Sequence, residues 1–441
     1  MIKMFTVQEA KQTILRREMA LEPEVPPALQ ARLDELFGVG STPDTAVTTI
    51  LHTIRQQGDT AVHHWTGRID GVELATFAVD KEELATAVSR IPADLADALR
   101  FAAGRIRQFH SYQPLPNWTT TEMGGRLGQR VTPIQRVGVY VPGGTAPLPS
   151  SLLMGVIPAQ VAGVPDIVAT TPPGRNGRVP DVILAAAAIA GVETVYTLGG
   201  AQAIGALAFG TESIRRVDKI VGPGNLFVTL AKKQVYGIVG IDGLYGPTET
   251  VVVADETANP AWVAADMLAQ AEHDVLATAI LLTPSRELAT AVQIEISKQL
   301  EDRSRADIIA VSLANQSGIV ITADMDEACA LASAFAAEHT CIASDNPQAW
   351  VDKIPHAGGL FIGERSFEVL GDYVAGPSHT MPTGGTARFA SPLNVSDFVK
   401  ISSTIELDDK TSALLSPIAA RIAQAELLDG HAAAAKRRLG D

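Results

Sequence analysis

Residues 137–144 read VGVYVPGG, an apolar stretch of strand length that runs directly into a turn of one proline and two glycines. The same arrangement recurs in the next part of the chain, where each expected strand again ends in a loop rich in Gly and Pro. The later strands are expected at 166–170, 194–198 and 219–221, and the helices near 150–163, 180–190, 201–209 and 226–236. This alternation predicts a parallel, doubly wound sheet. Ligands of such sheets bind at the carboxyl ends of the strands, so the four loops indicate a ligand of nucleotide size.

A second alternating series follows the first and extends the α/β class along the chain. Its strands are expected at 250–254, 279–282, 308–311, 319–322 and 360–362, and its helices at 259–272, 286–300 and 325–337. Residues 7–37 and 43–111 are expected to be mostly helical, with Thr42 and Asp80 as N-caps. Residues 371–391 are rich in Gly, Pro and Thr, which is typical of a functional loop. The chain returns to helix from about residue 407 to residue 438.

The composition excludes several classes of protein. Of the 441 residues, 46% are hydrophobic, which is enough for a large core and too many for a disordered chain. The formal charge of −14 argues against nucleic acid or an anionic membrane as partner, because both require clustered Lys and Arg. Two cysteines, Cys329 and Cys341, cannot build a disulfide framework. Without a signal-like or membrane-spanning apolar segment, the expected location is the cytoplasm.

Gln270 and His273 are candidate metal ligands. Their spacing places them on one face of the expected helix. An imidazole beside a carbonyl oxygen suits zinc, although an amide oxygen is an uncommon ligand. Taken alone, the pair is better explained as an exposed polar helix end.

Glu338 and His339 form a carboxylate–imidazole pair that we expect at the end of a helix. Such a pair can divide two proton transfers between groups of different pKa. Any Glu-His dipeptide offers the same chemistry, so by itself the pair is more typical of a solvated helix end.

Two further acid–histidine combinations lie towards the end of the chain. Asp372 and His379 flank a dense Gly, Pro and Ser loop, for which a function is favoured over a simple connection. Glu426 and His431 lie near the terminus, where a lone histidine on a helix ordinarily faces solvent.

The dinucleotide-binding fingerprint is incomplete. Residues 222–227 read GPGNLF, which begins like GxGxxG but lacks the third glycine. No acidic residue clearly takes the role of binding the ribose. The spacing alone therefore gives only weak support to an NAD site.

Six motifs, taken together and in their order, resemble the histidinol dehydrogenase family. They are VYVPGG at 139–144, GGAQA at 199–203, DKIVGPGN at 218–225, GPTE at 246–249, AQAEHD at 269–274 and GDYVAGPSH at 371–379. The resemblance covers the chain from about residue 45 to its end. Each motif alone has little specificity, but the set is highly specific.

The resemblance implies an activity and a set of site residues. The family oxidises L-histidinol through the aldehyde to L-histidine, in histidine biosynthesis, with two NAD⁺ and one zinc ion per subunit. The implied roles are zinc binding by Gln270, His273, Asp372 and His431; catalysis by Glu338 and His339; NAD binding by Tyr140, Gln202 and Asn225; and substrate binding by Thr248, Glu426, His379, His339 and the zinc ligands.

The resemblance also implies an architecture. Two α/β domains of incomplete Rossmann type are expected, with an N-terminal arm and a helical C-terminal tail. The expected bounds are 1–28 for the arm, 29–136 with 250–390 for the first domain, 137–249 for the second, NAD-binding domain, and 391–441 for the tail. The family is a homodimer in which the tail reaches the partner's site, and its substrate is a small molecule.

Departures from the family pattern leave the substrate open. Ala337 and Thr340 flank the Glu-His pair where Pro and Leu are usual, Thr248 replaces Ser, and residues 243–245 read GLY in place of Met-Pro-Ala. A dehydrogenase of the same fold that acts on another alcohol is therefore one alternative. A non-catalytic zinc- or nucleotide-binding protein is a second, which the retained Glu338 and His339 disfavour.

Overall fold

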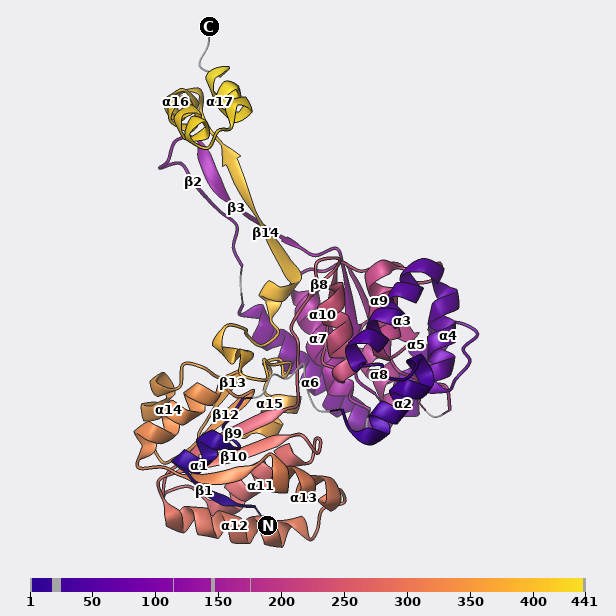
Figure 1. The fold of residues 1–441 in the computed structure, drawn as a ribbon, viewed down its shortest axis with the longest axis vertical. Coiled ribbons are helices and arrows are strands. Elements are labelled where there is room, and N and C mark those ends of the chain that lie inside the picture. Colours follow the sequence, from indigo (N-terminus) through magenta and orange to yellow (C-terminus); the bar gives the residue numbers. More distant parts are fainter. Residues whose placement is uncertain (1, 18–24, 114, 144–146, 175, 439–441) are drawn as a thin grey trace.

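Two parallel β-sheets, each covered by helices, form the body of the protein in its computed structural model (Figure 1). The structure describes residues 2–17, 25–113, 115–143, 147–174 and 176–438, so Gly144 of the first loop lies outside the described residues. The expected α/β class with two Rossmann-like sheets is confirmed.

The five-stranded sheet contains the first alternating series. Its strand order is β6-β5-β4-β7-β8. The elements are β4 (Arg136–Tyr140), α7 (Pro149–Val161), β5 (Asp166–Thr171), α8 (Asp181–Ala190), β6 (Thr194–Thr197), α9 (Gly200–Phe209), β7 (Lys219–Val221), α10 (Leu226–Val235) and β8 (Gly240–Ile241). The chain runs outward from β4 to β6 and then returns beside β4 as β7. This reversal is the topological switch point at which open α/β sheets bind their ligands.

The six-stranded sheet contains the second series, with the order β1-β11-β10-β9-β12-β13. Its elements are β1 (Met4–Thr6), α1 (Val7–Gln12), β9 (Glu249–Ala254), α11 (Pro260–Ala271), β10 (Thr278–Thr283), α12 (Arg286–Leu300), α13 (Ala306–Asn315), β11 (Gly318–Ile321), α14 (Met325–Phe335), β12 (His339–Ala343), β13 (Gly359–Ile362) and α15 (Glu368–Tyr373). The N-terminal segment, expected to be a helical arm, supplies the edge strand β1 beside β11.

Local sequence signals differ in how well they predict the elements. Thr42 and Asp80 are N-caps as expected, each accepting backbone N–H bonds from the first helical turn. The prediction of a strand at 308–311 is wrong, because these residues lie in helix α13 (Ala306–Asn315). A short apolar run fits a buried strand and a helix equally well. Here the helix buries Ile309 and Leu313, one turn apart, on the same face.

The helices of residues 27–111 cover the five-stranded sheet. They are α2 (Pro27–Phe37), α3 (Pro43–Gln57), α4 (Asp59–Asp70), α5 (Lys81–Thr86) and α6 (Ala93–Ser111). Val47 and Ile50 of α3 share a core with Ile204 of α9, and α6 packs against α7. We expected residues 29–136 to join residues 250–390 in one domain, and this packing corrects that expectation. Helical periodicity predicts an apolar face but not the surface that the face will cover.

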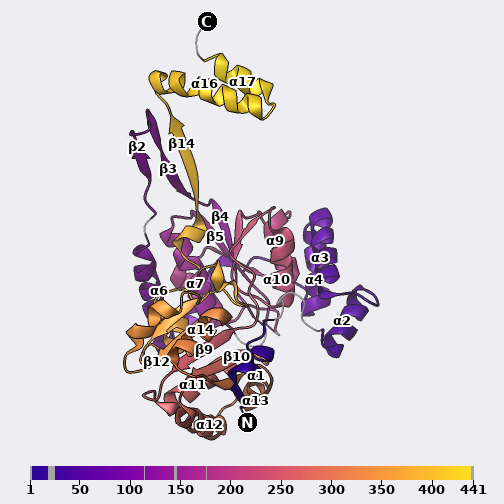
Figure 2. The same ribbon diagram turned by 60° about the vertical axis from the view of Figure 1, so that its left-hand side comes forward.

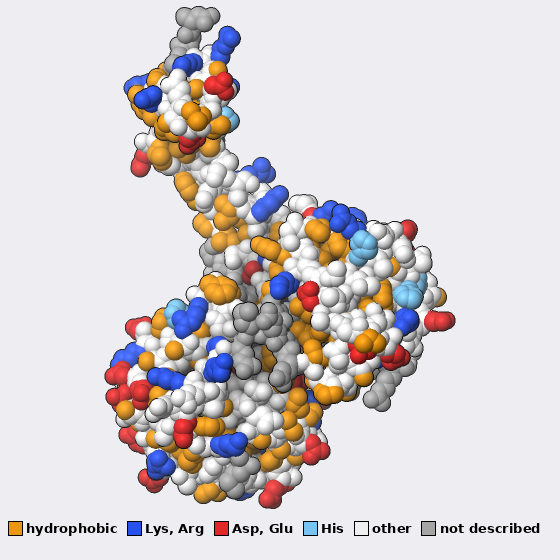
Figure 3. Space-filling view, viewed as in Figure 1, with side chains coloured by type: hydrophobic (Ala, Val, Ile, Leu, Met, Phe, Trp, Pro, Cys, Tyr) orange, Lys and Arg blue, Asp and Glu red, His pale blue; other side chains and the backbone are white. Residues whose placement is uncertain are grey.

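A three-stranded antiparallel sheet, here called the stalk, projects from the body and carries two helices at its far end (Figures 1 and 2). The stalk consists of β2 (Trp118–Thr120), β3 (Arg126–Pro133) and β14 (Val399–Glu406), and the tail helices are α16 (Asp409–Ala425) and α17 (Asp429–Lys436). Apolar side chains are exposed along both parts, as the space-filling view in Figure 3 also shows: Ile401, Ile405, Leu414, Ile418, Ile422 and Leu427. The stalk separates the tail helices from both parallel sheets.

A buried ion pair holds the loop that follows β7. Lys232 donates from Nζ to the carbonyl oxygen of Gly222 at 2.8 Å and to Asp242 Oδ1 at 2.5 Å. Asp242 Oδ2 in turn accepts the N–H of Gly222 at 2.7 Å. Gly222 has φ of +115°, and a side chain there would collide with the carbonyl oxygen of Tyr140. The glycine and the ion pair together fix the loop at the switch point.

Lys232→Met is expected to lower the free energy of unfolding by about 3–5 kcal/mol, because it leaves the Asp242 carboxylate buried without its partner. Burial already lowers the pKa of Lys232, and Asp242 opposes that shift. Urea unfolding would measure the loss, with Lys233→Met, at the exposed neighbouring position on α10, as the matched control. Equal free energies of unfolding for the two variants would contradict a stabilising role of the Lys232–Asp242 pair.

Candidate active site

A cavity of about 190 Å³, here called the inter-sheet cavity, lies where the two sheets face each other. Leu148, Ser151 and Pro223 line it from the five-stranded side. The other side is lined by residues of the six-stranded sheet and its loops: Thr248, His273, Glu338, His339, Asp372, Tyr373 and His379. His339 pairs with Thr250 at the amino ends of β12 and β9. The candidate site therefore uses the amino edge of this sheet, although the sequence pattern predicts carboxyl edges.

The Glu-His pair lies at the start of a strand, which corrects the expected helix end. Helix α14 ends at Phe335, and Ala336 takes a left-handed conformation with φ of 53°. This turn reverses the chain so that β12 begins at His339. The backbone of Glu338 then accepts the N–H of Gly359 at 2.8 Å, which anchors the pair between two strands.

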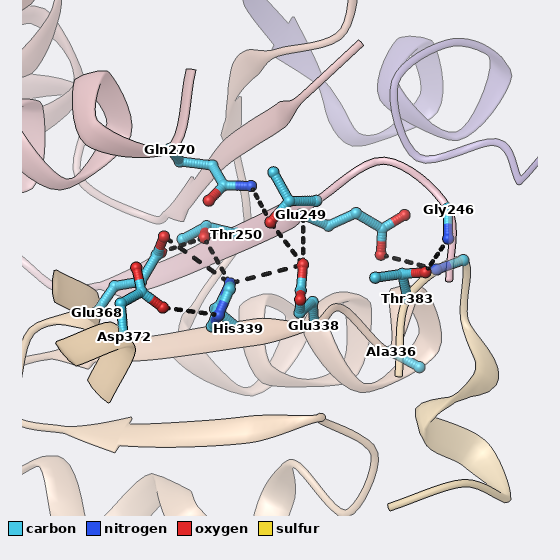
Figure 4. A network of polar contacts seen from close by, with 12 residues as sticks. Gly246, Glu249, Thr250, Gln270, Ala336, Glu338, His339, Glu368, Asp372 and Thr383 are labelled. Carbon is cyan, nitrogen blue, oxygen red and sulfur yellow. Dashed lines mark hydrogen bonds and ion pairs between the residues drawn. The ribbon is translucent and has the colours of Figure 1, made fainter. Parts of the chain in front are cut away.

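Glu338 is buried and held by β9 (Figure 4). Its Oε2 atom accepts the hydroxyl of Thr248 at 2.5 Å and the N–H of Glu249 at 3.3 Å. Gln270 donates from Nε2 to the same Thr248 hydroxyl at 3.0 Å. Burial raises the pKa of Glu338 well above its usual value, and the hydrogen bond from Thr248 opposes this shift. A carboxyl group in this environment holds a proton more readily than an exposed one, as a group for proton transfer requires.

The imidazole of His339 lies among three carboxyl groups (Figure 4). Its Nδ1 atom is 3.9 Å from Glu338 Oε2 and 3.8 Å from Glu368 Oε1, and its Nε2 atom is 3.8 Å from Asp372 Oδ1. Burial lowers the pKa of His339, while Asp372 opposes that shift. Its Nε2 atom has no hydrogen-bond partner among the described residues. A neutral ring with a free nitrogen in a cavity is suited to accept a proton.

A cluster of possible metal ligands lies beside the pair. One ligand atom each of His273, Glu368 and Asp372 lies within 4.8 Å of the others. Gln270 is buried, and its Oε1 atom has no hydrogen-bond partner among the described residues. An imidazole, carboxylates and an unpartnered amide oxygen are a donor set that fits a divalent cation such as zinc.

The elements that carry these ligands differ from the expected ones. His273 follows the end of α11 at Ala271, and Asp372 lies on the short helix α15, within the stretch expected to be a loop. Glu368, which the sequence reasoning missed, lies one turn before Asp372 on α15, so an i, i+4 pair of acids was the signal available. Burial raises the pKa values of Glu368 and Asp372 to about 7 each.

His379 completes the wall of the inter-sheet cavity. Its Nδ1 atom lies 2.9 Å from the carbonyl oxygen of Asp372 and must therefore carry the proton of that hydrogen bond. Its Nε2 atom lies 3.3 Å from the hydroxyl of Ser151 on α7, which joins the two sides of the cavity. Burial lowers the pKa of His379 to about 4, so this histidine is neutral at physiological pH.

Glu426 and His431 are not brought to the cavity within one chain. Glu426 caps α16 and His431 lies on α17, and both side chains are exposed at the far end of the stalk (Figure 2). The expected roles of these two residues in metal and substrate binding therefore have no support inside a single chain. The other expected residues, Thr248, Gln270, His273, Glu338, His339, Asp372 and His379, do lie together.

A second cavity, of about 380 Å³ and here called the switch-point cavity, lies at the carboxyl edge of the five-stranded sheet. The three expected NAD contacts, Tyr140, Gln202 and Asn225, all line it. The Tyr140 hydroxyl accepts the N–H of Gly200 at 3.2 Å, and Asn225 caps the N-terminus of α10. The two cavities adjoin the same loop, because Pro223 lines one and Asn225 the other.

Comparisons with known proteins identify relatives over most of the chain. The profile of the histidinol dehydrogenase family matches residues 40–439. Histidinol dehydrogenase of Deinococcus radiodurans is 49% identical over 94% of this chain and 95% of its own. That of Cupriavidus pinatubonensis is 45% identical over 98% of both chains.

A solved structure supports the fold as well. The crystal structure of histidinol dehydrogenase from Elizabethkingia anophelis superposes with a TM-score of 0.90 at 33% identity, covering 99% of this chain and 98% of that one. No described helix is long and apolar enough to span a membrane. With the family profile, the relatives and the fold in agreement, the chain belongs to the histidinol dehydrogenase family.

Proposed function

We propose that this chain oxidises L-histidinol through L-histidinal to L-histidine with two NAD⁺, as the last steps of histidine biosynthesis. The observation that carries the proposal is the buried pair Glu338 and His339, which lines one cavity with His273 and Asp372, while Gln270 lies behind Thr248 of the same wall. A bound zinc ion would supply electrophilic binding of the substrate's imidazole and amino nitrogens. These two functions, proton transfer and substrate fixation, need different side chains, and the cavity provides both.

His339 is the base for the first oxidation. His339 lines the cavity and its Nε2 atom has no hydrogen-bond partner among the described residues, so this nitrogen would take the proton of the alcohol as a hydride passes from the carbinol carbon to bound NAD⁺. The products would be the aldehyde, NADH and the proton held by His339. Asp372, 3.8 Å from Nε2, stabilises the imidazolium that results.

Glu338 serves the second oxidation. The aldehyde must add water before another hydride can leave, and Glu338, which lines the cavity, would take a proton from that water in its ionised form. Oxidation of the resulting hydrate by a second NAD⁺ would remove a hydride and release a second proton, which leaves the carboxylic acid. Thr248 holds the Glu338 carboxyl in place through the 2.5 Å hydrogen bond. The substrate contacts of Thr248 and His379 in this scheme follow from their place in the cavity wall.

NAD⁺ would bind across the two cavities. Tyr140, Gln202 and Asn225 line the switch-point cavity, and the shared loop at residues 222–225 leads from there to the inter-sheet cavity. Hydride transfer requires the nicotinamide to lie beside the substrate. The N-terminus of α9 has no side-chain cap, so its backbone N–H groups are placed to bind the pyrophosphate between the two ends.

A homodimer with shared sites accounts for Glu426 and His431. We infer that the tail helices reach across to a second subunit, so that the partner subunit's His431 becomes the fourth zinc ligand and the partner subunit's Glu426 contacts substrate. The exposed apolar side chains of the stalk and α16 are the expected contact surface. A soluble dimer of this kind is consistent with the cytoplasm as its location.

Two alternatives, a dehydrogenase for another alcohol and a non-catalytic binding protein, have less support than oxidation of L-histidinol. Ala337 and Thr340, which depart from the family pattern, are fully buried and are not among the described residues that line the inter-sheet cavity. Thr248 does line it, but its hydroxyl keeps the chemistry of the usual Ser. A non-catalytic binding protein would not need a base with a free nitrogen in the cavity.

The stoichiometry of the reaction tests the proposal. With L-histidinol as limiting substrate, about two NADH should form per molecule, because the aldehyde is oxidised again before release. Absorbance of NADH measures the yield, and protein treated with a chelator and then resupplied with zinc serves as the control for the metal. One NADH with free aldehyde in solution would contradict the two-step assignment, and turnover only with other alcohols would favour the alternative substrate.

A further inference from the structure

Asp70 is an acidic residue in the switch-point cavity to which the sequence assigned no role. It is the last residue of α4, and it lines the cavity together with Tyr140, Gln202 and Asn225. Gln202 is fully buried and donates from Nε2 to Asp70 Oδ2 at 2.9 Å. The amide oxygen of Gln202 has no hydrogen-bond partner among the described residues. A buried amide thus fixes the carboxyl group of Asp70 at the cavity wall.

The arrangement of the two cavities decides which part of a dinucleotide lies beside Asp70. The nicotinamide must be next to the substrate, in the inter-sheet cavity that Pro223 lines. The other end of the same molecule, the adenosine, then lies beyond the loop in the switch-point cavity. Phe37, Ile69 and Phe227 provide apolar wall there for an adenine base.

The carboxyl group of Asp70 suits a ribose diol and opposes a phosphate. A carboxylate accepts hydrogen bonds from two neighbouring hydroxyls, whereas a 2′-phosphate brings further negative charge against it. Arg32 is the one cation among the described residues that line this cavity. Its guanidinium is already bonded to Glu35 at 2.7 Å and to the carbonyl oxygen of Arg68 at 3.1 Å.

We propose that Asp70 binds the ribose hydroxyls of the adenosine half and thereby selects NAD over NADP. This inference rests on the proposed function, which places NAD in the switch-point cavity. Asp70 takes the place of the acidic residue that a complete Rossmann fingerprint carries after its second strand. Here the carboxylate comes from a helix outside the sheet. Burial raises the pKa of Asp70 to about 6, with the Gln202 hydrogen bond opposing the shift, so the group is ionised above neutral pH.

The test is direct titration of the full-length protein with NADH and with NADPH, followed by the fluorescence of the dinucleotide at pH 8. The wild-type protein should bind NADH more tightly. Asp70→Asn keeps the shape and an acceptor for Gln202, and it should reduce the ratio of NADPH to NADH dissociation constants by about tenfold or more, the effect of one hydrogen bond to a charged group. Asp97→Asn, on the exposed surface of α6, is the matched control and should leave the ratio unchanged.

The outcomes separate this inference from the proposed function. Absence of binding of either dinucleotide by the wild-type protein would contradict the proposed function itself. Equal binding of NADH and NADPH by the wild-type protein, or an unchanged ratio in a folded Asp70→Asn, would overturn the role of Asp70 alone. If Asp70→Asn fails to fold, Asp70→Ser, which retains a hydroxyl acceptor for Gln202, is measured in the same way. Should that variant also fail to fold, the titrations of the wild-type protein still test the inference, because equal dissociation constants for NADH and NADPH would overturn it.

Discussion

His339→Asn is expected to lower kcat by a factor of about 10²–10⁴, the usual contribution of a positioned general base. The reason is that His339 lines the cavity beside Glu338, with a lowered pKa and an Nε2 atom that has no hydrogen-bond partner among the described residues. KM for the alcohol should change little, because proton transfer and not binding is lost. Steady-state kinetics measures both constants, and His52→Asn, at an exposed position on α3, is the matched control.

Glu338→Gln separates the two oxidations. It should impair conversion of the aldehyde more than conversion of the alcohol, since Glu338 is assigned to the water that adds to the aldehyde. Assays started from L-histidinol and from L-histidinal distinguish the steps, and zinc content is measured on the same samples. The assignment would be contradicted if His339→Asn and Glu338→Gln both lost zinc while the rate of each oxidation per bound zinc ion stayed at the wild-type value.

Truncation before Glu426 is expected to leave the two sheets folded but to lower kcat/KM by a factor of about 10² or more, because the chain would lose Glu426 and the proposed zinc ligand His431. The truncation removes α17, which lies with α16 at the far end of the stalk, away from both parallel sheets (Figure 1). Zinc binding should weaken together with activity. Circular dichroism and metal analysis of the truncated chain check both statements.

Mixing two inactive proteins tests whether the site is shared. One protein carries Glu338→Gln with His339→Asn, and the other carries His431→Ala. In a heterodimer with crossing tails, one site combines an intact cavity with an intact His431, so some activity returns. If each tail closed the site of its own chain, verified heterodimers would show no recovery, and the shared-site proposal would fail. A mixture of His431→Ala with itself is the control.

The sequence predicted the strands and loops near the two cavities better than it predicted how elements pack against one another. The strands that end at Tyr140 and Val221 and the loops behind them follow from apolar runs bounded by Gly and Pro. The stalk strand β14 reads VKISSTIE and is exposed along most of its length, so it has no buried face for a pattern to reveal. Its pairing with β3 depends on residues far away in the chain. Packing partners of this kind cannot be derived from periodicity alone.

For a similar reason, the sequence predicted only some of the residues of the candidate site. Glu338 and His339 are adjacent in the sequence, so a motif can point to them. Glu368 and Asp70 are single acids whose roles depend on what tertiary packing places beside them: Thr250 and His339 for one, Gln202 for the other. Asp70 has no spacing that distinguishes it from other acidic residues, and the i, i+4 spacing of Glu368 with Asp372 is equally typical of a solvated helix face.

The shared loop at residues 222–225 has a consequence for the fate of the aldehyde. Free aldehydes react with amines, so an enzyme that makes one as an intermediate benefits from confining it. The inter-sheet and switch-point cavities share no described lining residue and both adjoin this loop, which the Lys232–Asp242 pair fixes in place. Spent NADH could therefore be exchanged for NAD⁺ through one cavity while the aldehyde stays in the other. The rigid loop would then act as a partition that keeps a reactive compound away from the rest of the cell.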